Sequence, residues 1–409
     1  MGFVVVAERF AEALRTPGME QTDVEIAAPK GDAAKLSPWE WLPAAAFACL
    51  IPLYLMAEPG GLAARFAFFV GLGLLPGVVW RLLGKSSWNV HRIGFAAGLV
   101  AFVLDNPELR PDAGTWRKII DNWHLAALGF LVSFTQPVWG ALRTRRLLND
   151  TGVPIGFLGA LKLILIGSFF NIFLPGSTGG DAYRVYAVTR DYQTRLSSAI
   201  ASISLDRFLG LPSLILVVLL GMALDHKFFL ANKTLSSLVP FITGAGAVCL
   251  ILVLYLLFAG WSHRRPDSRT QADDGQEKGW LGRLHRTLAT NVKRPATLPL
   301  ALFYGFMSHI ACIVSCLLFG LALSVQGVEP LRYFLIVPMA MTINAIPGAP
   351  GGVGQGELAM ATLLDWAGPG HGNLQLGVMV MLLFRLSNMA IGLGGGALYA
   401  FGRESGKWR

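Results

Sequence analysis

The sequence predicts an all-α polytopic membrane protein with about eight transmembrane helices and two re-entrant helical hairpins in an inverted repeat. Three observations predict this fold class. Of the 409 residues, 54% are hydrophobic and only 14% are charged, which is too apolar for a soluble domain of this size. Apolar runs long enough to cross a bilayer recur along the chain. Two further apolar regions are each interrupted by proline and glycine at their middle.

The apolar runs divide the chain into an N-terminal segment, two peripheral helices and two repeats. Candidate spanning runs lie at residues 41–57, 66–83, 124–142, 199–224, 238–259, 298–324 and 374–401. A further run, 93–104, is short and spans only with the help of flanking residues that snorkel. The predicted organisation is a cytoplasmic segment at 1–40, peripheral transmembrane helices at 41–87, a first repeat at 88–224, and a second repeat at 238–401 that includes a cytoplasmic loop at 262–295.

The two interrupted regions lie at residues 154–191 and 332–366, and both contain an Asn followed shortly by the pattern PGxxGG. Proline removes a backbone donor and clashes with the preceding turn, and glycine loses the most conformational freedom in a helix, so a helix should break at each pattern. Unpaired backbone at membrane depth is tolerated only where protein buries it or where it lines a wet cavity. Each region is therefore predicted to be a re-entrant hairpin that faces the interior of the bundle. The break residues are Pro175, Gly176, Gly179 and Gly180 in the first hairpin, and Pro347, Gly348, Gly351 and Gly352 in the second.

The distribution of basic residues predicts the orientation of the chain. The formal net charge is +9. With the N-terminus in the cytoplasm and 93–104 crossing the bilayer, most loop Lys and Arg residues, among them Arg143, Arg145 and Arg146, fall on the cytoplasmic side. Both termini are then cytoplasmic, and the two hairpins enter from opposite sides as inverted repeats, an arrangement in which transporters bind substrate near the midplane. If 93–104 does not span, the N-terminal orientation reverses and the first repeat loses one helix.

The sequence disfavours several classes of function. The basic residues lie in short loops and form no patch interleaved with aromatic residues, so nucleic acid is not expected as a partner. The four cysteines lie in apolar runs without further ligands at suitable spacing, so neither a metal site nor a disulfide framework is expected. No Walker A motif, dinucleotide-binding fingerprint, HExxH or GxSxG pattern occurs. The sequence therefore predicts a protein that is not an enzyme and that uses no cofactor.

Charged residues inside apolar segments are candidates for function because they are costly there. Arg207 and Arg385 lie in the helices that follow the two hairpins, so pseudo-symmetry predicts comparable places for them. One interpretation is that both guanidinium groups bind an anionic phosphate together with backbone donors at the breaks. The other is that they form internal ion pairs, Arg207 with Asp206 or Asp181 and Arg385 with Glu357. The candidate substrate-binding residues are Arg207, Arg385, Asp181, Arg184, Asp206, Glu357, Asn171 and Asn344.

Four of these candidates also have local interpretations. Asp181 and Arg184 are three residues apart, which equally suits a pair on one helix. Asn171 and Asn344 stand at matching places before the two breaks. Their amide side chains are expected mainly to satisfy backbone groups that the proline-glycine turns leave unpaired, with ligand contact as a secondary role.

The interrupted motifs carry a resemblance to a known family. The stretches FFNIFLPGSTGGDAYRVYAVTR, SLDRFLG and NAIPGAPGGVGQGE, and more loosely LLFRLSN, resemble the lysylphosphatidylglycerol synthase transmembrane region family. The resemblance covers roughly Ile93 to Phe401. It implies a flippase-like domain that moves aminoacylated phospholipids or related lipids between leaflets. The sequence ends at Arg409 without an aminoacyl-transferase domain, so synthase activity is not expected to carry over.

The expected function is therefore that of a lipid flippase or scramblase in the bacterial cytoplasmic membrane, acting on an anionic or aminoacylated phospholipid or a related lipid. Two alternatives stay open. One is a carrier of polyprenyl phosphate, and the other is a non-transporting scaffold that presents lipid to a separate transferase. Membrane lipids are the expected partners, and a separately encoded lipid-modifying transferase and a homodimer are left open.

Overall fold

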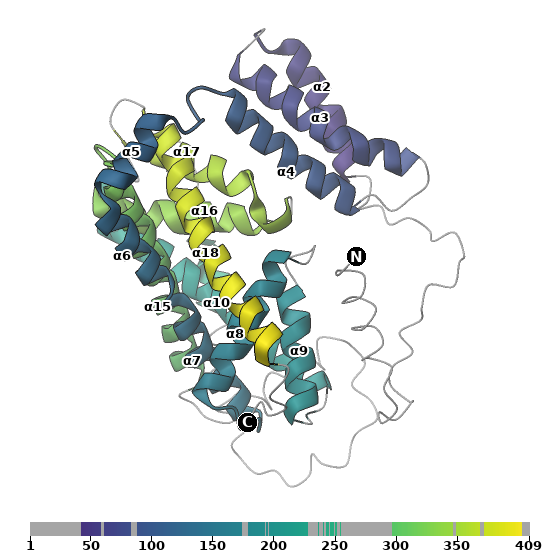
Figure 1. Ribbon diagram of the computed structural model, residues 1–409, viewed down its shortest axis with the longest axis vertical. Coiled ribbons are helices and arrows are strands. Elements are labelled where there is room, and N and C mark those ends of the chain that lie inside the picture. Colours follow the sequence, from purple (N-terminus) through teal and green to yellow (C-terminus); the bar gives the residue numbers. More distant parts are fainter. Residues whose placement is uncertain are drawn as a thin grey trace. The chain divides into compact units, whose positions relative to one another are not determined.

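The computed structural model describes residues 42–58, 61–82, 88–173, 179–192, 194, 196–227, 297–346, 349–368 and 372–402, with some residues between 236 and 254. Every regular element in this part of the chain is helical, which confirms the all-α class. The helices labelled in Figure 1 are α2 (Leu42–Met56), α3 (Leu62–Leu82), α4 (Trp88–Asp105), α5 (Ala113–Asp121), α6 (Trp123–Ser133), α7 (Gln136–Asp150), α8 (Phe157–Phe173), α9 (Gly179–Tyr192), α10 (Leu196–Leu224), α15 (Thr297–Ala322), α16 (Tyr333–Ala345), α17 (Gln355–Ala367) and α18 (Leu374–Gly402). Short 3₁₀ turns lie at Pro330–Arg332 and Pro350–Gly352.

Five helical segments among the described residues are long and apolar enough to cross a membrane. They are Leu62–Val79, Trp123–Asp150, Ser202–Leu224, Thr297–Ala322 and Leu374–Phe401. Two shorter apolar helices, Ala45–Met56 and Phe157–Ile172, accompany them. The protein is therefore a multi-pass membrane protein, as its composition predicts. The short run at 93–104 lies inside α4, an unbroken helix of 18 residues.

Pro137 divides the second of these segments into α6 and α7. Proline has no backbone N–H and is favoured in the first turn of a helix, and Pro137 lies in the first turn of α7. Helix α7 then continues to Asp150, past residue 142, where hydropathy ends the run. Arg143 therefore lies on a helix of the bundle, and the prediction that it is a loop charge is wrong.

Close helix packing follows the glycines of α3 and α4. The GxxxG spacing of Gly94 and Gly98 predicts such packing. A Cβ atom on Gly94 would collide with the carbonyl oxygen of Gly73, and one on Gly98 would collide with the backbone at Phe69. The two helices therefore approach each other backbone to backbone, as predicted.

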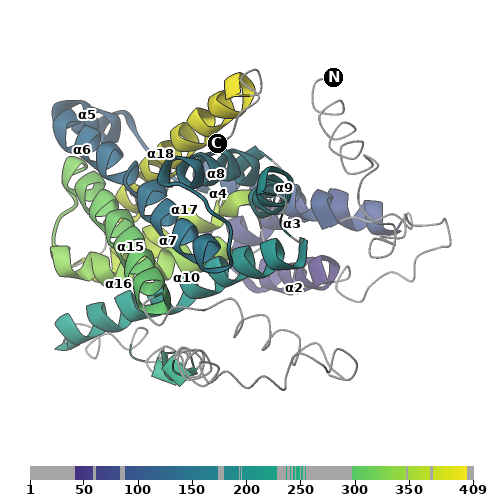
Figure 2. The same ribbon diagram turned by 90° about the horizontal axis from the view of Figure 1, so that it is seen from below.

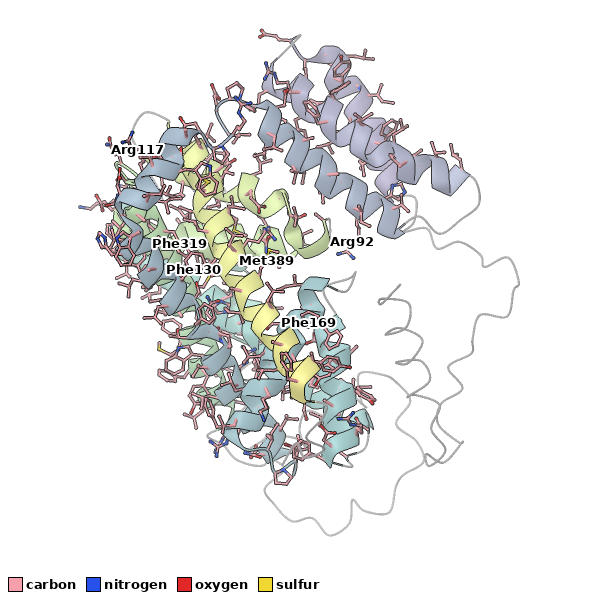
Figure 3. All side chains as sticks on the ribbon, in the orientation of Figure 1. Arg92, Arg117, Phe130, Phe169, Phe319 and Met389 are labelled. Atoms are coloured by element: carbon pink, nitrogen blue, oxygen red, sulfur yellow. The ribbon has the colours of Figure 1, made fainter. Side chains whose placement is uncertain are left out.

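Helix α15 contributes many buried residues to the core. It packs against α6, α7, α10 and α16 (Figure 2). Phe319 of α15 meets Phe130 of α6 edge to face, with ring centroids 5.4 Å apart (Figure 3). Ser133 of α6 bonds Ser315 of α15 at 2.5 Å and accepts a hydrogen bond from Ser387 of α18 at 3.1 Å. Because a buried hydroxyl without a partner is costly, this network fixes the positions of the three helices relative to one another.

The two interrupted regions form two helix pairs that contact opposite halves of α18 (Figure 1). The first pair is α8 with α9, and the second is α16 with α17. Gly377, near the start of α18, lies against the α17 backbone at Ala361. Gly395, near the end of α18, lies against the α8 carbonyl of Leu165. Two hairpins that enter a bilayer from opposite sides would have this arrangement.

Several predicted features lie outside the described residues. These are the break residues Pro175, Gly176, Pro347 and Gly348, the segment 1–40, the loop 262–295 and most of the run 238–259. The described break residues are Gly179, Gly180, Gly351 and Gly352.

Candidate functional site

A polar cavity of about 220 Å³ lies among α7, α8, α9, α10, α15 and α18, beside the first hairpin. Four charged side chains line it, and amide and hydroxyl groups complete its wall. The charged residues are Arg143, Arg184, Asp206 and Arg207, and the amides are Gln136, Asn171 and Asn388. Charged and polar groups are rare and costly inside apolar helices, so the cavity is the leading candidate for a binding site.

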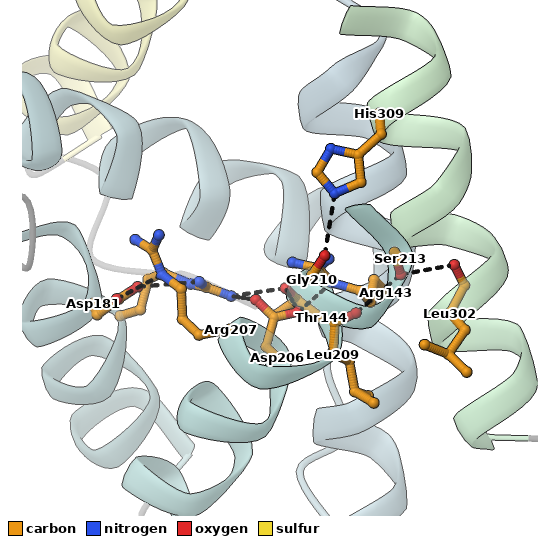
Figure 4. Close-up of polar contacts among 11 residues, drawn as sticks. Arg143, Thr144, Asp181, Asp206, Arg207, Leu209, Gly210, Ser213, Leu302 and His309 are labelled. Carbon is orange, nitrogen blue, oxygen red and sulfur yellow. Dashed lines mark hydrogen bonds and ion pairs between the residues drawn. The ribbon is translucent and has the colours of Figure 1, made fainter. Parts of the chain in front are cut away.

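Asp206 is the centre of the charged cluster (Figure 4). Its residue is only 1% exposed. One carboxylate oxygen accepts hydrogen bonds from Arg143 Nε at 2.7 Å and from Thr144 Oγ1 at 3.3 Å, and the other accepts from Arg184 Nη2 at 2.9 Å. Arg184 Nη2 also donates to Thr144 Oγ1 at 2.7 Å. A buried carboxylate needs such charged donors, so Asp206 ties α7 and α9 to α10.

Arg207 stands next to this centre but has a different environment. Its Nε donates to Asp181 Oδ2 at 2.7 Å, which joins α10 to the start of α9. Asp181 also lies 3.4 Å from Arg184 Nη1. The Arg207 side chain is 52% exposed, so its guanidinium is available to a second anion while Asp181 holds one edge.

Two buried nitrogen atoms of the cavity residues have no hydrogen-bond partner among the described residues. They are Arg184 Nε and Gln136 Nε2. Arg184 as a whole is only 5% exposed, so water outside the protein does not satisfy its Nε. Buried donors are normally paired. Two donors without such a partner thus belong to residues that line this cavity.

The charges of the cluster do not cancel. Three guanidinium groups, of Arg143, Arg184 and Arg207, share the two carboxylates of Asp181 and Asp206. One positive charge is left over in the described site. In a low-dielectric region this excess attracts an anion strongly.

A second charged cluster lies at the second hairpin and is charge-balanced. Arg385 of α18 donates to both oxygens of Glu357, at 2.5 Å from Nε and 3.0 Å from Nη2. The same guanidinium donates to the carbonyl oxygens of Gly351 at 2.7 Å and Gly352 at 3.1 Å, and to Asn344 Oδ1 at 3.3 Å. Glu357 Oε2 also accepts from the backbone N–H of Gly354 at 2.8 Å. This bidentate pair closes the helix break instead of lining a polar cavity.

The backbone of the second break explains its glycines. Gly351 and Gly352 have φ values of +61° and +68°, which residues with a Cβ rarely adopt. A Cβ on Gly352 would also collide with Asn344. The end of α16 is satisfied by Gln355, whose Nε2 donates to the carbonyl oxygens of Ile343 at 2.8 Å and Ile346 at 2.7 Å. The side chain of Gln355 therefore supplies donors that the broken helix lacks.

The second hairpin borders an apolar groove. It has a volume of about 290 Å³ and lies between α3 and α4 on one side and α16 and α17 on the other. Phe95 and Leu99 of α4 face Leu358 and Trp366 of α17 across it. The first hairpin thus lines a charged cavity, whereas the second lines a hydrocarbon-like groove.

The structure brings the predicted residues together in two separate groups. Asp181, Arg184, Asp206 and Arg207 form the first group, and Glu357 and Arg385 form the second. The pairings Arg207 with Asp181 and Arg385 with Glu357 are those of the internal ion-pair interpretation. The pairing of Arg207 with Asp206 does not occur, because Asp206 points to Arg143 and Arg184.

Of the two Asn side chains, that of Asn171 has the backbone partner expected for both, and that of Asn344 has a side-chain partner. Asn171 Oδ1 accepts from the backbone N–H of Gly180 at 2.9 Å, so it satisfies a donor at the start of α9. Asn344 Oδ1 accepts from Arg385, and its backbone carbonyl accepts from Gln355 Nε2 at 3.2 Å. Asn171 also lines the polar cavity.

Sequence reasoning missed Arg143, Thr144 and Gln136. Hydropathy places Arg143 in a loop, yet its spacing on α7 sets Gln136 and Arg143 seven residues apart, on one helical face. His309 of α15 was also missed, and its Nε2 lies 3.2 Å from the carbonyl oxygen of Gly210, close to this cluster (Figure 4). Within the described residues, no group of three or more His, Cys, Asp or Glu residues is arranged to hold a metal ion.

Comparison with known proteins gives one match. The family model described as the lysylphosphatidylglycerol synthase TM region matches residues 89–396. The match begins at the start of α4 and ends within α18, so it contains both hairpins and both charged clusters. Searches of curated proteins and of solved structures found no match.

Proposed function

Because the chain belongs to the lysylphosphatidylglycerol synthase transmembrane region family, whose members have a lipid-related membrane function, we propose that it is a lipid flippase or scramblase. It moves an anionic or aminoacylated phospholipid, or a related lipid, between the leaflets of the bacterial cytoplasmic membrane. The observation that supports this most directly is the polar cavity at the first hairpin, with its excess positive charge. The proposal includes no catalytic step and no cofactor.

The cavity suits a lipid headgroup because it lies among helices long and apolar enough to span the bilayer. A phosphate that leaves the interface loses its hydration, and this loss is the main barrier to crossing hydrocarbon. Guanidinium groups inside the bundle replace part of that hydration with charge-assisted hydrogen bonds. The half-exposed Arg207 side chain is the first group that a headgroup would reach.

The movement that we propose is a rocking of the α8–α9 hairpin against α10. Asp181 at the start of α9 holds Arg207 of α10, and a phosphate that binds Arg207 weakens this link. The break residues Gly179 and Gly180 stand at the same end of α9. With both termini in the cytoplasm, this hairpin opens to the cytoplasmic leaflet, and the α16–α17 hairpin enters from the other side.

Reconstitution into liposomes tests the proposal. Vesicles contain phosphatidylcholine and a trace of headgroup-labelled phosphatidylglycerol, and dithionite quenches the label of the outer leaflet. Arg143→Ala and Arg207→Ala are expected to slow the translocation rate at least about tenfold, since each removes a charged hydrogen-bond donor. Arg65→Ala, which removes an exposed ion pair with Asp105, is the matched control and should keep the wild-type rate.

Other outcomes identify the alternatives. Unchanged rates in both cavity variants would remove the cavity from the mechanism. Movement of labelled polyprenyl phosphate, with no movement of phosphatidylglycerol, would replace the phospholipid by that carrier substrate. Binding of lipid without movement, restored only by a separate transferase, would indicate a scaffold that presents lipid.

A further inference from the structure

We propose that the polar cavity is a phosphate site with a capacity of one negative charge, and that it therefore selects phosphodiester headgroups over phosphomonoesters. The inference rests on the proposed function, since it specifies the headgroup that the same cavity accepts. It assigns the phosphate to Arg143, Arg184, Arg207 and Gln136, of which only Arg184 and Arg207 are predicted by the sequence.

The charge count carries the first step. In the described site, three guanidinium groups face two carboxylates, so one anionic charge brings the cluster to neutrality. A phosphodiester carries one negative charge. A phosphomonoester carries about 1.5 to 2 negative charges near pH 7. The second charge of a monoester would stand close to Asp206 without a counter-ion, and like charges in a low-dielectric site repel strongly.

The negative charge of Asp206 cannot move away when a second anionic charge enters the cavity. Both oxygens of this carboxylate are engaged by Arg143 and Arg184, at 2.7 and 2.9 Å. The residue is 1% exposed, so the carboxylate cannot turn into water when an anion enters. Asp206 therefore sets a fixed negative charge in the wall, which limits how much anionic charge the site holds.

The unused donors carry the second step. Arg184 Nε and Gln136 Nε2 are both buried, and neither has a partner among the described residues. The residues to which they belong both line the cavity. They can donate to the two non-ester oxygens of a phosphodiester. One of these donors is a neutral amide, which offers a hydrogen bond but adds no charge.

The size of the cavity agrees with a lipid headgroup. Its volume of about 220 Å³ is well above the roughly 10–15 Å³ that a single water molecule needs. A phosphate with a small substituent fits this space, while the acyl chains stay among the apolar helices.

The proposed preference for a headgroup with one negative charge is called the charge rule below. Two short-chain lipids with identical tails test it. Purified full-length protein in neutral detergent is titrated at pH 8 with dihexanoyl phosphatidylglycerol and with dihexanoyl phosphatidic acid, and binding is followed by isothermal calorimetry. The diester is expected to bind at least tenfold more tightly than the monoester. Equal or tighter binding of phosphatidic acid would overturn the proposal.

Variants that change the charge of the cluster sharpen the test. Asp181→Asn raises the net charge by one, so the preference for phosphatidylglycerol should shrink at least fivefold or reverse. Arg207→Gln lowers the net charge by one, so both lipids should bind more weakly and phosphatidic acid should lose more. Asp105→Asn, which changes an exposed residue paired with Arg65, should leave the ratio unchanged. If the ratio of the two lipid affinities stays constant in both cavity variants, the charge rule is contradicted. If one variant does not fold, the other variant alone makes this test.

The binding experiment is independent of transport. Protein that follows the charge rule but moves no lipid would refute the flippase and keep the phosphodiester site. Protein that moves lipid without the predicted preference would keep the flippase and refute the charge rule.

Discussion

The arginines beside the two hairpins, Arg207 on α10 and Arg385 on α18, have opposite environments. At the second hairpin, Arg385 is saturated by one carboxylate, two carbonyl oxygens and one amide, and the charges cancel. At the first, Arg207 is 52% exposed and belongs to a cluster with one positive charge in excess. The comparison shows that two halves with the same motif can differ in the charge balance around the break. One break is closed by a charge-balanced network, and the other borders a cluster with one positive charge in excess.

The spacing of the acidic residue explains much of this difference. Asp181 directly follows Gly180, whereas Glu357 stands five residues after Gly352. Glu357 can therefore turn back to the first turn of α17, where it accepts from Gly354 N–H and meets Arg385. Asp181 is too close to its break for this and reaches across to Arg207 on α10. The longer spacing thus lets the acidic residue close the second break, whereas the shorter spacing directs Asp181 to a neighbouring helix at the edge of the cavity.

The largest effect is expected from Arg385→Met. The change leaves Glu357, whose side chain is only 10% exposed, without its counter-ion, and loss of one partner of a buried pair costs about 3–5 kcal/mol. Unfolding of the purified protein by denaturant or heat measures this loss. The double variant with Glu357→Gln should recover part of it, because no unpaired charge remains. A double variant no more stable than the single one would show that Arg385 acts through the glycine carbonyls alone.

Asp206→Asn should have the next largest effect on stability. It removes the carboxylate shared by Arg143 and Arg184, and we expect a loss of about 2–3 kcal/mol, less than for Arg385→Met because the cavity admits water and anions. The loss should shrink when phosphatidylglycerol replaces phosphatidylcholine around the protein, since an anionic headgroup neutralises the freed guanidinium groups. Equal losses in both lipids would mean that the first cluster is as closed as the second.

The fold could be predicted from the sequence further than the site. Composition and apolar runs give the membrane class, and the two PGxxGG patterns give the two helix pairs, because proline and glycine act locally. The site depends on which faces of distant helices meet. Arg143 illustrates the limit: hydropathy ends the apolar run at residue 142, while the helix continues to Asp150. Its partner Asp206 lies 63 residues away, a pairing that no local pattern indicates.

The predicted equivalence of Arg207 and Arg385 shows a second limit of prediction from the sequence. Their places after the two hairpins predict equivalent roles, and the structure gives them different partners. Symmetry of motifs describes the backbone, whereas charge balance depends on single residues such as Asp181 and Glu357. From the sequence, an ion pair between each arginine and a nearby carboxylate is only one of two interpretations, the other being phosphate binding.

Substitution of Gly395 tests whether the first hairpin needs close contact with α18. A Cβ at Gly395 would collide with the carbonyl oxygen of Leu165 on α8, and overpacking of this kind costs about 1–3 kcal/mol. We expect Gly395→Ala to lower the thermal midpoint and the translocation rate together. Gly394→Ala is the matched control, because a Cβ there meets nothing within 4 Å. Equal effects of the two substitutions would show that α8 and α18 separate readily.

The smallest effect is expected from Arg207→Lys, and its contrast with Arg385→Lys is the finest test of the comparison. Exposed ion pairs contribute about 0–1 kcal/mol, so Lys at 207 should keep its attraction to Asp181, with a change in unfolding free energy below about 0.5 kcal/mol. Lys at 385 cannot reproduce the planar set of donors that reaches Glu357 and the two glycine carbonyls at once, so this variant should unfold at a clearly lower temperature. Equal thermal midpoints would mean that Arg385 serves only as a point charge. In that case the backbone of the break itself would hold the second hairpin. The functional difference between the two halves would then come only from the polar cavity at the first hairpin.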